Sequence, residues 1–161
     1  MLLYLVRHAY AGQRGDPQYP DDSLRPITKK GRKQFDRLVK ALAAGKFAPA
    51  AIGTSPLLRC MQTADVLAAR LPTQIKPQQV EAFSPGCEVE EVIAWAKQAG
   101  AQEIAMVGHA PDVDTIASAL LGAADESVHF AKGAIAAIEF NAEPATGKGT
   151  LLWLITPKLI A

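Results

Sequence analysis

The chain has 161 residues, of which 49% are hydrophobic and 20% are charged, a balance that excludes a disordered protein. A chain of this length can bury a core without disulfides or a structural metal, and two cysteines are too few for a disulfide framework. No apolar run approaches the ~18 residues of a membrane-spanning helix, and the opening lacks the pattern of a signal peptide. We therefore expect one domain spanning residues 1–161 in the cytoplasm, with no membrane or nucleic-acid partner.

Charge is unevenly distributed along the chain, although the net charge is only +1. Residues 1–59 hold 11 Lys and Arg against 4 Asp and Glu, whereas residues 60–161 hold 6 against 12. The first segment therefore carries a net charge of +7 and is a candidate for binding anions. A solvated surface with a local charge bias fits the same count.

The first part of the chain predicts a strand, a loop and a helix. Leu2–Val6 is a short apolar run bounded by charge, which is typical of a buried strand. The segment 12–26 is rich in Gly, Pro and Asp and predicts a loop. Thr28 can cap a helix that Gly45 can end. The apolar residues of that helix recur at helical spacing: Phe35, Leu38, Val39 and Leu42.

A second strand and helix follow. Ala51–Thr54 is a short apolar strand, after which Ser55 as N-cap and Pro56 at the first helical position predict the start of a helix. The predicted apolar face of this helix consists of Leu57, Met61, Ala64, Ala68 and Leu71. The segment Ile75–Val80, which follows the helix, alternates weakly and predicts a third strand.

The remaining elements complete the alternation. They are a helix from Val89 to Ala96 closed by Gly100, a strand at Glu103–Val107, a turn at Gly108–Pro111, a helix from Val113 to Leu120 closed by Gly122, and strands at Ala134–Phe140 and Thr150–Thr156. Strands that alternate with helices predict an α/β fold, a three-layer α/β/α sandwich with a mostly parallel central sheet. We expect the last two strands to form an antiparallel hairpin at the end of the sheet.

Three of the predicted strands end in residues that carry chemistry. In an α/β sheet, ligands bind at the carboxyl ends of the strands. Imidazoles, guanidinium groups and helix N-termini at one edge favour a site for an oxyanion such as a phosphoryl group. A neutral imidazole can attack phosphorus, and a protonated imidazole can offset the charge of the phosphoryl oxygens. The residues in question are Arg7, His8, Ser55, Arg59 and His109.

Ordinary structural interpretations of these residues stay open. His8 alone could be satisfied by backbone at a strand end, and Arg59 could pair with Asp36 or Asp65 across a helix surface. His129 lies at no strand end, so we expect it to be structural or exposed.

A metal site is not indicated by the spacing of potential ligands. His8, His109 and Asp112 could meet, but they lack the register of known histidine and carboxylate motifs. Cys60 follows Arg59 and is expected to be a small buried residue of its helix. The sequence therefore predicts a protein without metal or cofactor.

Three short motifs resemble those of the histidine phosphatase superfamily, whose fold is that of phosphoglycerate mutase. They are Leu5–Ala9 (LVRHA), Ser55–Ala64 (SPLLRCMQTA) and Val107–His109 (VGH). Within the superfamily, Asp22–Thr28 (DSLRPIT), followed by Gly31, resembles the SixA-type protein phosphohistidine phosphatases. The superfamily usually has Gly where Ala9 stands, a change that this branch tolerates.

The resemblance implies roles for the residues at the strand ends. His8 would be the phosphorylated nucleophile, with Arg7, Arg59 and His109 as the other catalytic residues that hold the phosphoryl group. Arg25 and Ser55 are further candidates for binding the substrate.

A carboxylate that protonates the leaving group is present in larger members of the superfamily. Glu81 follows the weak third strand, near where this acid would fall, and is the candidate here, although a solvated loop residue fits as well. An imidazole leaving group, with an ordinary pKa of about 6.5, needs little help from such an acid.

The function implied is a metal-independent phosphatase that hydrolyses phosphohistidine on a protein through phospho-His8. Two alternatives remain: a small-molecule or phosphoserine/phosphothreonine phosphatase of the same superfamily, and a catalytically silent module that binds a phosphorylated ligand. The presence of both histidines argues against the second, because binding alone needs only the arginines.

The basic helix after Thr28 suggests how a protein substrate is guided. Its apolar stripe should face the sheet and leave the charges outward, where they would steer an acidic phosphoprotein, such as a histidine phosphotransfer domain, toward His8. A solvated basic helix without a partner fits the same pattern. Residues 28–46 hold one acid, Asp36, and seven basic residues: Lys29, Lys30, Arg32, Lys33, Arg37, Lys40 and Lys46.

Overall fold

The structure is a computed structural model that describes residues 1–45, 47–125 and 127–160, so that Lys46 of the basic helix region lies outside the described residues. None of the helices in these ranges is long and apolar enough to cross a membrane. The elements, with 3₁₀ helices labelled η, are β1 (Leu2–Arg7), η1 (Asp22–Leu24), α1 (Lys29–Ala44), β2 (Ala51–Thr54), α2 (Leu58–Ala68), β3 (Gln78–Gln79), η2 (Glu81–Phe83), α3 (Val89–Gln98), β4 (Glu103–Gly108), α4 (Asp112–Leu121), β5 (Ile135–Glu139), β6 (Thr150–Ile155) and η3 (Pro157–Leu159).

One six-stranded sheet with the order β3-β2-β4-β1-β5-β6 organises the fold. The strands β3, β2, β4 and β1 run parallel, whereas β5 is antiparallel to β1. The expected hairpin of β5 and β6 is confirmed at one end of the sheet. Because β1, β2 and β4 are parallel neighbours, their carboxyl ends meet at one edge, where the sequence placed its reactive residues.

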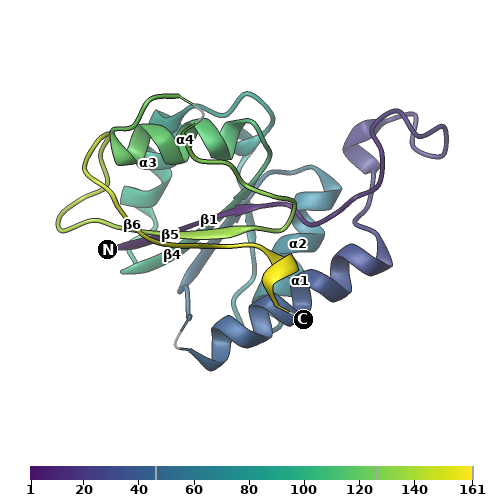
Figure 1. The fold of residues 1–161 in the computed structure, drawn as a ribbon, viewed down its shortest axis with the longest axis horizontal. Helices are drawn as coiled ribbons and strands as arrows, with labels where there is room; N and C mark the ends of the chain where they lie inside the picture. The colour runs from purple at the N-terminus through teal and green to yellow at the C-terminus, as the bar shows by residue number, and fades with distance from the viewer. Residues whose placement is uncertain (46, 126, 161) are drawn as a thin grey trace.

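Helices cover both faces of the sheet, α3 and α4 on one side and α1 and α2 on the other (Figure 1). Alternate residues of β1 point to opposite faces, so Leu3 and Leu5 pack in the core under α3 and α4, while Tyr4 and Val6 pack against α1 and α2. A strand buried on both faces is apolar at every position, which explains the continuous apolar run that marked this strand in the sequence.

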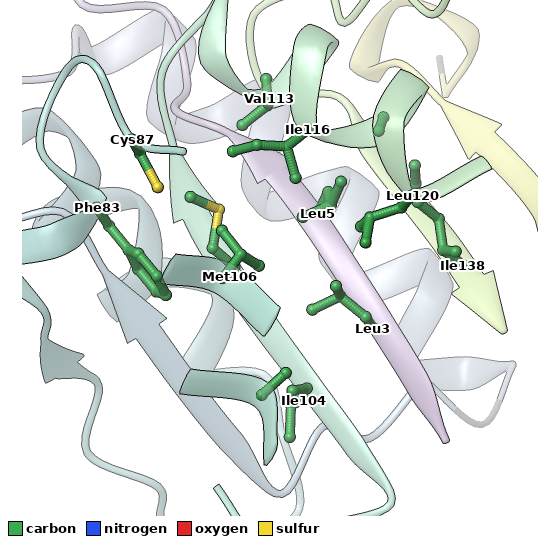
Figure 2. Close-up of a cluster of buried hydrophobic side chains, with 14 of the residues drawn as sticks. Leu3, Leu5, Phe83, Cys87, Ile104, Met106, Val113, Ile116, Leu120 and Ile138 are labelled. Atoms are coloured by element: carbon green, nitrogen blue, oxygen red, sulfur yellow. The ribbon is translucent and has the colours of Figure 1, made fainter. Parts of the chain in front are cut away.

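The core between the sheet and α4 brings leucine, isoleucine, valine and methionine side chains together (Figure 2). From the sheet come Leu3, Leu5, Ile104, Met106 and Ile138, and from the helix Val113, Ile116 and Leu120. All of them are at most 1% exposed. This packing fixes α4, and with it the residues just before its first turn, relative to the end of β4.

The ends of the helices follow from local chemistry. Thr28 caps α1 as expected, because its Oγ1 accepts a hydrogen bond of 3.0 Å from the Gly31 amide. Gly122 ends α4 in the left-handed conformation, with a φ of 68° that favours glycine. The expected apolar face of α1 is confirmed by burial of Phe35, Leu38 and Val39.

Two expectations about local structure are met only in part. Helix α2 begins at Leu58 rather than at Pro56, because the Ser55 amide still donates to the Val107 carbonyl of β4 as an extension of β2. Of the expected apolar face, Ala64 is buried and Ala68 and Leu71 pack against the core. Leu57 and Met61 are only partly buried, whereas Cys60 and Thr63 are fully buried. The third strand is present but shorter than expected, since it consists only of Gln78–Gln79.

Gly31 sits where α1 approaches the chain after β1 most closely. A Cβ atom at this position would lie 2.3 Å from the Tyr10 carbonyl oxygen, an atom that cannot move away without dragging the backbone. We predict that Gly31→Ala lowers the free energy of unfolding by about 1–3 kcal/mol, as overpacking of a buried contact does.

Urea denaturation measures this change, and Gly45→Ala at the other end of α1 is the matched control. A Cβ atom at Gly45 would lie 3.4 Å from the Leu42 carbonyl oxygen, at the edge of ordinary contact, and its φ of −103° suits any residue. Equal effects of the two substitutions would contradict the close approach at Tyr10.

Candidate active site

A pocket of about 340 Å³ opens at the carboxyl ends of the central strands. It brings together five of the seven residues that the sequence singled out, but neither Ser55 nor Glu81 is part of its wall. The lining residues are Arg7, His8, Gly12, Arg14, Asp22, Arg25, Arg59, Pro85, His109, Ala110, Pro111, Asp112 and Lys132.

His8 is held in place through its backbone and its ring. Its amide donates to the Gly108 carbonyl at the end of β4, its own carbonyl accepts from Gly133, each at 3.0 Å, and its Nδ1 lies 2.8 Å from the Ala9 carbonyl oxygen. Because a carbonyl only accepts hydrogen bonds, Nδ1 carries the proton and Nε2 keeps a free electron pair. Burial, with the nearby charges of Arg59 and Arg7 as further causes, lowers the pKa of His8 to about 3. The imidazole is therefore a neutral nucleophile at ordinary pH.

His109 faces His8 with ring centroids 5.5 Å apart and an angle of 62° between the planes. Its Nε2 is 2.8 Å from the Ser55 hydroxyl and 3.5 Å from Cys60 Sγ. Burial and the charge of Arg59 lower the pKa of His109 to about 4, so the ring is neutral at ordinary pH. The protonated form that would offset phosphoryl charge must therefore be induced by the arriving anion, which raises the pKa of a neighbouring imidazole.

Asp22, on η1, orients two arginines of the pocket. Its carboxylate accepts from Arg25 Nε at 2.8 Å and lies 3.1 Å from a terminal nitrogen of Arg59, which also donates to the Asp22 carbonyl at 2.8 Å. Hydrogen bonding to Arg25 is the main cause that lowers the pKa of Asp22. The alternative pairings of Arg59 are wrong: Asp36 instead makes two hydrogen bonds of 2.6 Å with Arg70, and Asp65 forms no ion pair with Arg59.

Arg7 is oriented from the opposite side of the pocket. A terminal nitrogen of its guanidinium donates to the Phe130 carbonyl, and the Phe130 amide donates to the buried carboxylate of Asp114 at 3.0 Å. Burial lowers the pKa of Arg7 and the charge of Asp114 opposes this, so the guanidinium stays charged. His129 is the exposed residue that the sequence suggested, and its Nδ1 lies 3.1 Å from Asp114.

Ser55 does not lie where a residue that contacts the substrate would lie, and Glu81 does not lie where an acid of the pocket would lie. Ser55 is fully buried behind His109, so it acts on that ring rather than on a ligand. Its hydroxyl can accept from or donate to His109, and thus suits both protonation states of the ring. Glu81 is an exposed residue of η2 and the structure does not bring it to the pocket.

Four polar lining residues were not singled out as site residues by the sequence. Asp22 lies inside the motif that resembles the SixA-type branch, next to Arg25, and that position was the available signal. Asp112 was weighed only as a metal ligand, and Lys132 and Arg14 lie in turns without a recognisable pattern. They reach the pocket because distant loops converge on the same edge of the sheet.

Within the part of the chain that the structure describes, no group of three His, Cys, Asp or Glu residues could hold a metal ion. Cys60 is buried as expected, and burial raises the pKa of its thiol to about 12. Arginine side chains, among them Arg7, Arg25 and Arg59, bring positive charge to the pocket wall.

A neutral imidazole nucleophile facing a second imidazole among buried arginines defines a phosphoryl-transfer site on an α/β sandwich. The model of the histidine phosphatase superfamily (branch 1) matches residues 3–84. An uncharacterised protein from Picosynechococcus is 34% identical over 123 residues, which cover 74% of this chain and 73% of that protein. The chain belongs to the histidine phosphatase superfamily, branch 1.

Solved structures share the whole fold. The protein histidine phosphatase SixA complexed with tungstate superposes with a TM-score of 0.85 over 100% of both chains, at 22% identity. A phosphoserine phosphatase from Entamoeba histolytica, complexed with 3-phosphoglyceric acid, superposes with a TM-score of 0.70 over 96% of both chains, at 17% identity. At these identities the likeness shows a common fold.

The low pKa of His8 leads to a prediction about its titration. The ring of His8 should remain neutral between about pH 8 and pH 5, because burial favours the uncharged form. NMR of ¹³C-labelled histidine, with His8→Asn to assign the signal, measures this directly. A midpoint near the ordinary value of about 6.5 would contradict a desolvated nucleophile.

The same shift has a consequence for stability. Unfolding returns the pKa of His8 from about 3 to its ordinary value of about 6.5, so below that value the unfolded chain binds more protons. The contribution of the neutral His8 ring to the free energy of unfolding is therefore fully present above about pH 6.5. It is lost progressively as the pH falls toward 3.

Proposed function

We propose that the protein hydrolyses phosphohistidine on a protein substrate through a phosphohistidine intermediate at His8. The observation that supports this most is the hydrogen bond from His8 Nδ1 to the Ala9 carbonyl, which leaves Nε2 free to attack. Arg7 and Arg59 both line the pocket beside His8, and their guanidinium groups supply the positive charge that suits a bound oxyanion.

The reaction has two displacements at phosphorus. In the first, His8 Nε2 forms a bond to phosphorus while the bond from phosphorus to the substrate imidazole breaks, and the leaving nitrogen keeps the electron pair. In the second, a water oxygen forms a bond to the phosphorus of phospho-His8 while the bond to Nε2 breaks and its electron pair returns to Nε2. One water proton stays on the phosphate oxygen, the other passes to solvent, and inorganic phosphate leaves. Arg7, Arg59 and an induced imidazolium at His109 would offset the charge of the phosphoryl oxygens in both steps. No metal takes part.

The exposed position of Glu81 is compatible with this choice of substrate. A leaving imidazole has an ordinary pKa of about 6.5 and departs with little assistance, whereas an alkoxide needs a proton donor. Asp22 is poorly suited as a donor, because its contacts with arginine keep it ionised.

A second candidate is a phosphatase that acts on small molecules or on phosphoserine or phosphothreonine. The fold shared with the phosphoserine phosphatase from Entamoeba histolytica favours it, as does the carboxylate of Asp112 in the pocket wall. Steady-state kinetics with phosphohistidine and phosphoserine peptides separate the candidates, since the preferred leaving group has the higher kcat/KM.

Turnover should place an acid-labile, base-stable phosphate on His8, because a phosphoramidate decomposes in acid whereas a phosphoserine survives. Rapid quench of the enzyme with ³²P-labelled substrate in EDTA, followed by peptide mapping, detects it. We expect His8→Ala to lower kcat by at least about 10³-fold while the fold persists, as loss of a nucleophile does. His129→Ala, which removes an exposed histidine outside the pocket, is the matched control.

Three results would overturn this mechanism. Label recovered only on a hydroxyl such as that of Ser55 would exclude a histidine intermediate. Activity that is lost in EDTA and restored by one divalent metal would indicate a metallophosphatase. Binding of substrate without turnover would leave the silent phosphate-binding module as the function.

The basic face of α1 supports a protein as the substrate. All six of its described basic residues are exposed, and none of them lies within 4 Å of a carboxylate of a described residue. Three of these residues line a groove of about 610 Å³ beside Asp65, Val66 and Ala69 of the α2 region, and Asp36 is neutralised by Arg70. We propose that this face binds an acidic phosphoprotein, such as a histidine phosphotransfer domain; the three groove residues are Lys29, Arg32 and Lys33.

Reversing the charge of Lys29, Lys33 and Lys40 to Glu should lower kcat/KM for a phosphohistidine protein at low salt by at least about tenfold, because steering is electrostatic. Hydrolysis of inorganic phosphoramidate should not change. Reversal of three exposed lysines elsewhere, Lys76, Lys97 and Lys148, is the control of equal net charge. Equal losses in both triple variants would contradict a specific role for α1, and so would the absence of any loss.

A further inference from the structure

The mouth of the pocket holds more positive charge than one phosphoryl group requires. Five of its lining residues are cations and two are carboxylates, and Asp22 is already occupied by Arg25 and Arg59. Lys132 and Arg14 have no carboxylate of a described residue within 4 Å. Both are exposed, which places them at the entrance and not at the buried nucleophile.

Lys132 belongs to a short turn that is tied to the nucleophile itself. The next residue, Gly133, donates its amide to the carbonyl of His8 at 3.0 Å, and the Ala134 amide closes the turn on the Ala131 carbonyl at 2.9 Å. The backbone position of Lys132 is therefore fixed relative to His8. Lys132 and His8 line the same pocket, so one bound substrate can reach both.

The side chain of Lys132 is also oriented. Its Nζ lies 4.4 Å from the centre of the Tyr10 ring, within the range of a cation–π interaction. Tyr10 is anchored in turn, because its carbonyl accepts from the Thr28 amide at 2.8 Å. Partial burial and the charges of Arg7 and Arg25 lower the pKa of Lys132, as expected for a cation close to the phosphoryl site without a counterion.

We infer that Lys132, oriented by Tyr10 and assisted by Arg14, forms a second anion subsite that binds a carboxylate of the substrate next to the phosphoryl group. In the proposed function, on which this assignment of the substrate rests, the carboxylate is an Asp or Glu side chain close to the phosphohistidine. Arg7 and Arg59 hold the phosphoryl group. The subsite at Lys132 selects substrates that have an acidic residue next to the phosphohistidine.

Matched phosphohistidine peptides with Glu or Gln beside the phosphorylated residue test the subsite. Wild-type protein should prefer the Glu peptide by about fivefold in kcat/KM, the size of a partly exposed ion pair, with the difference in KM. Lys132→Gln should remove this preference for the Glu peptide, whereas Lys148→Gln in the β5–β6 loop should preserve it. Tyr10→Phe should keep the ratio and Tyr10→Leu should reduce it, because only an aromatic ring orients the ammonium.

A second measurement keeps the subsite testable if phosphohistidine is not the substrate. Phosphoglycolate, which carries a carboxylate next to its phosphoryl group, should compete for phosphate binding more tightly than methyl phosphate in wild-type protein, and Lys132→Gln should remove the difference. Loss of activity on both peptides with an intact phosphoglycolate preference would refute the proposed function alone. An unchanged preference in Lys132→Gln in either measurement would overturn the subsite.

Discussion

The hydrogen bond from His8 Nδ1 to the Ala9 carbonyl decides what the pocket can do. It places the proton on Nδ1 and leaves the electron pair on Nε2. Nδ1 lies 2.8 Å from the carbonyl oxygen, and in a solvated histidine water would compete for this hydrogen bond. The bond persists because β1 lies between β4 and β5 at the centre of the sheet, with both faces buried. The His8 backbone, just after β1, is hydrogen-bonded to Gly108 at the end of β4 and to Gly133 in the turn before β5.

Burial acts differently on the two kinds of cation in the site. Desolvation lowers the pKa of His8 to about 3 and that of His109 to about 4, and both rings become neutral. Desolvation also lowers the pKa of Arg7 and Arg59, but the ordinary pKa of a guanidinium lies so far above neutral that both groups stay charged. The pocket therefore combines a neutral nucleophile with permanent positive charge. A phosphoryl dianion would offset this charge and raise the pKa of the second imidazole, which would then take up a proton from solvent.

Much of this arrangement could be predicted from the sequence, since strand ends and helix caps are local features. Four of the site residues follow apolar runs of the sequence, and the parallel strands bring such positions to one edge of the sheet. They are Arg7, His8, Arg59 and His109. The contacts of Asp22 and Lys132 could not be predicted, because they depend on how irregular loops fold over that edge. Ser55 shows the limit of local patterns: its sequence context indicates a helix cap, but its hydroxyl bonds to His109, a residue distant in the sequence.

A crystal structure with vanadate would test the central claim most directly, because vanadate adopts the five-coordinate geometry of phosphorus during transfer. We expect a covalent contact between vanadium and His8 Nε2, with His8 Nδ1 still bonded to the Ala9 carbonyl. The vanadate oxygens should lie within hydrogen-bond distance of Arg7, Arg59 and His109. Vanadate bound to Ser55, or bound in the pocket without contact to His8, would contradict it.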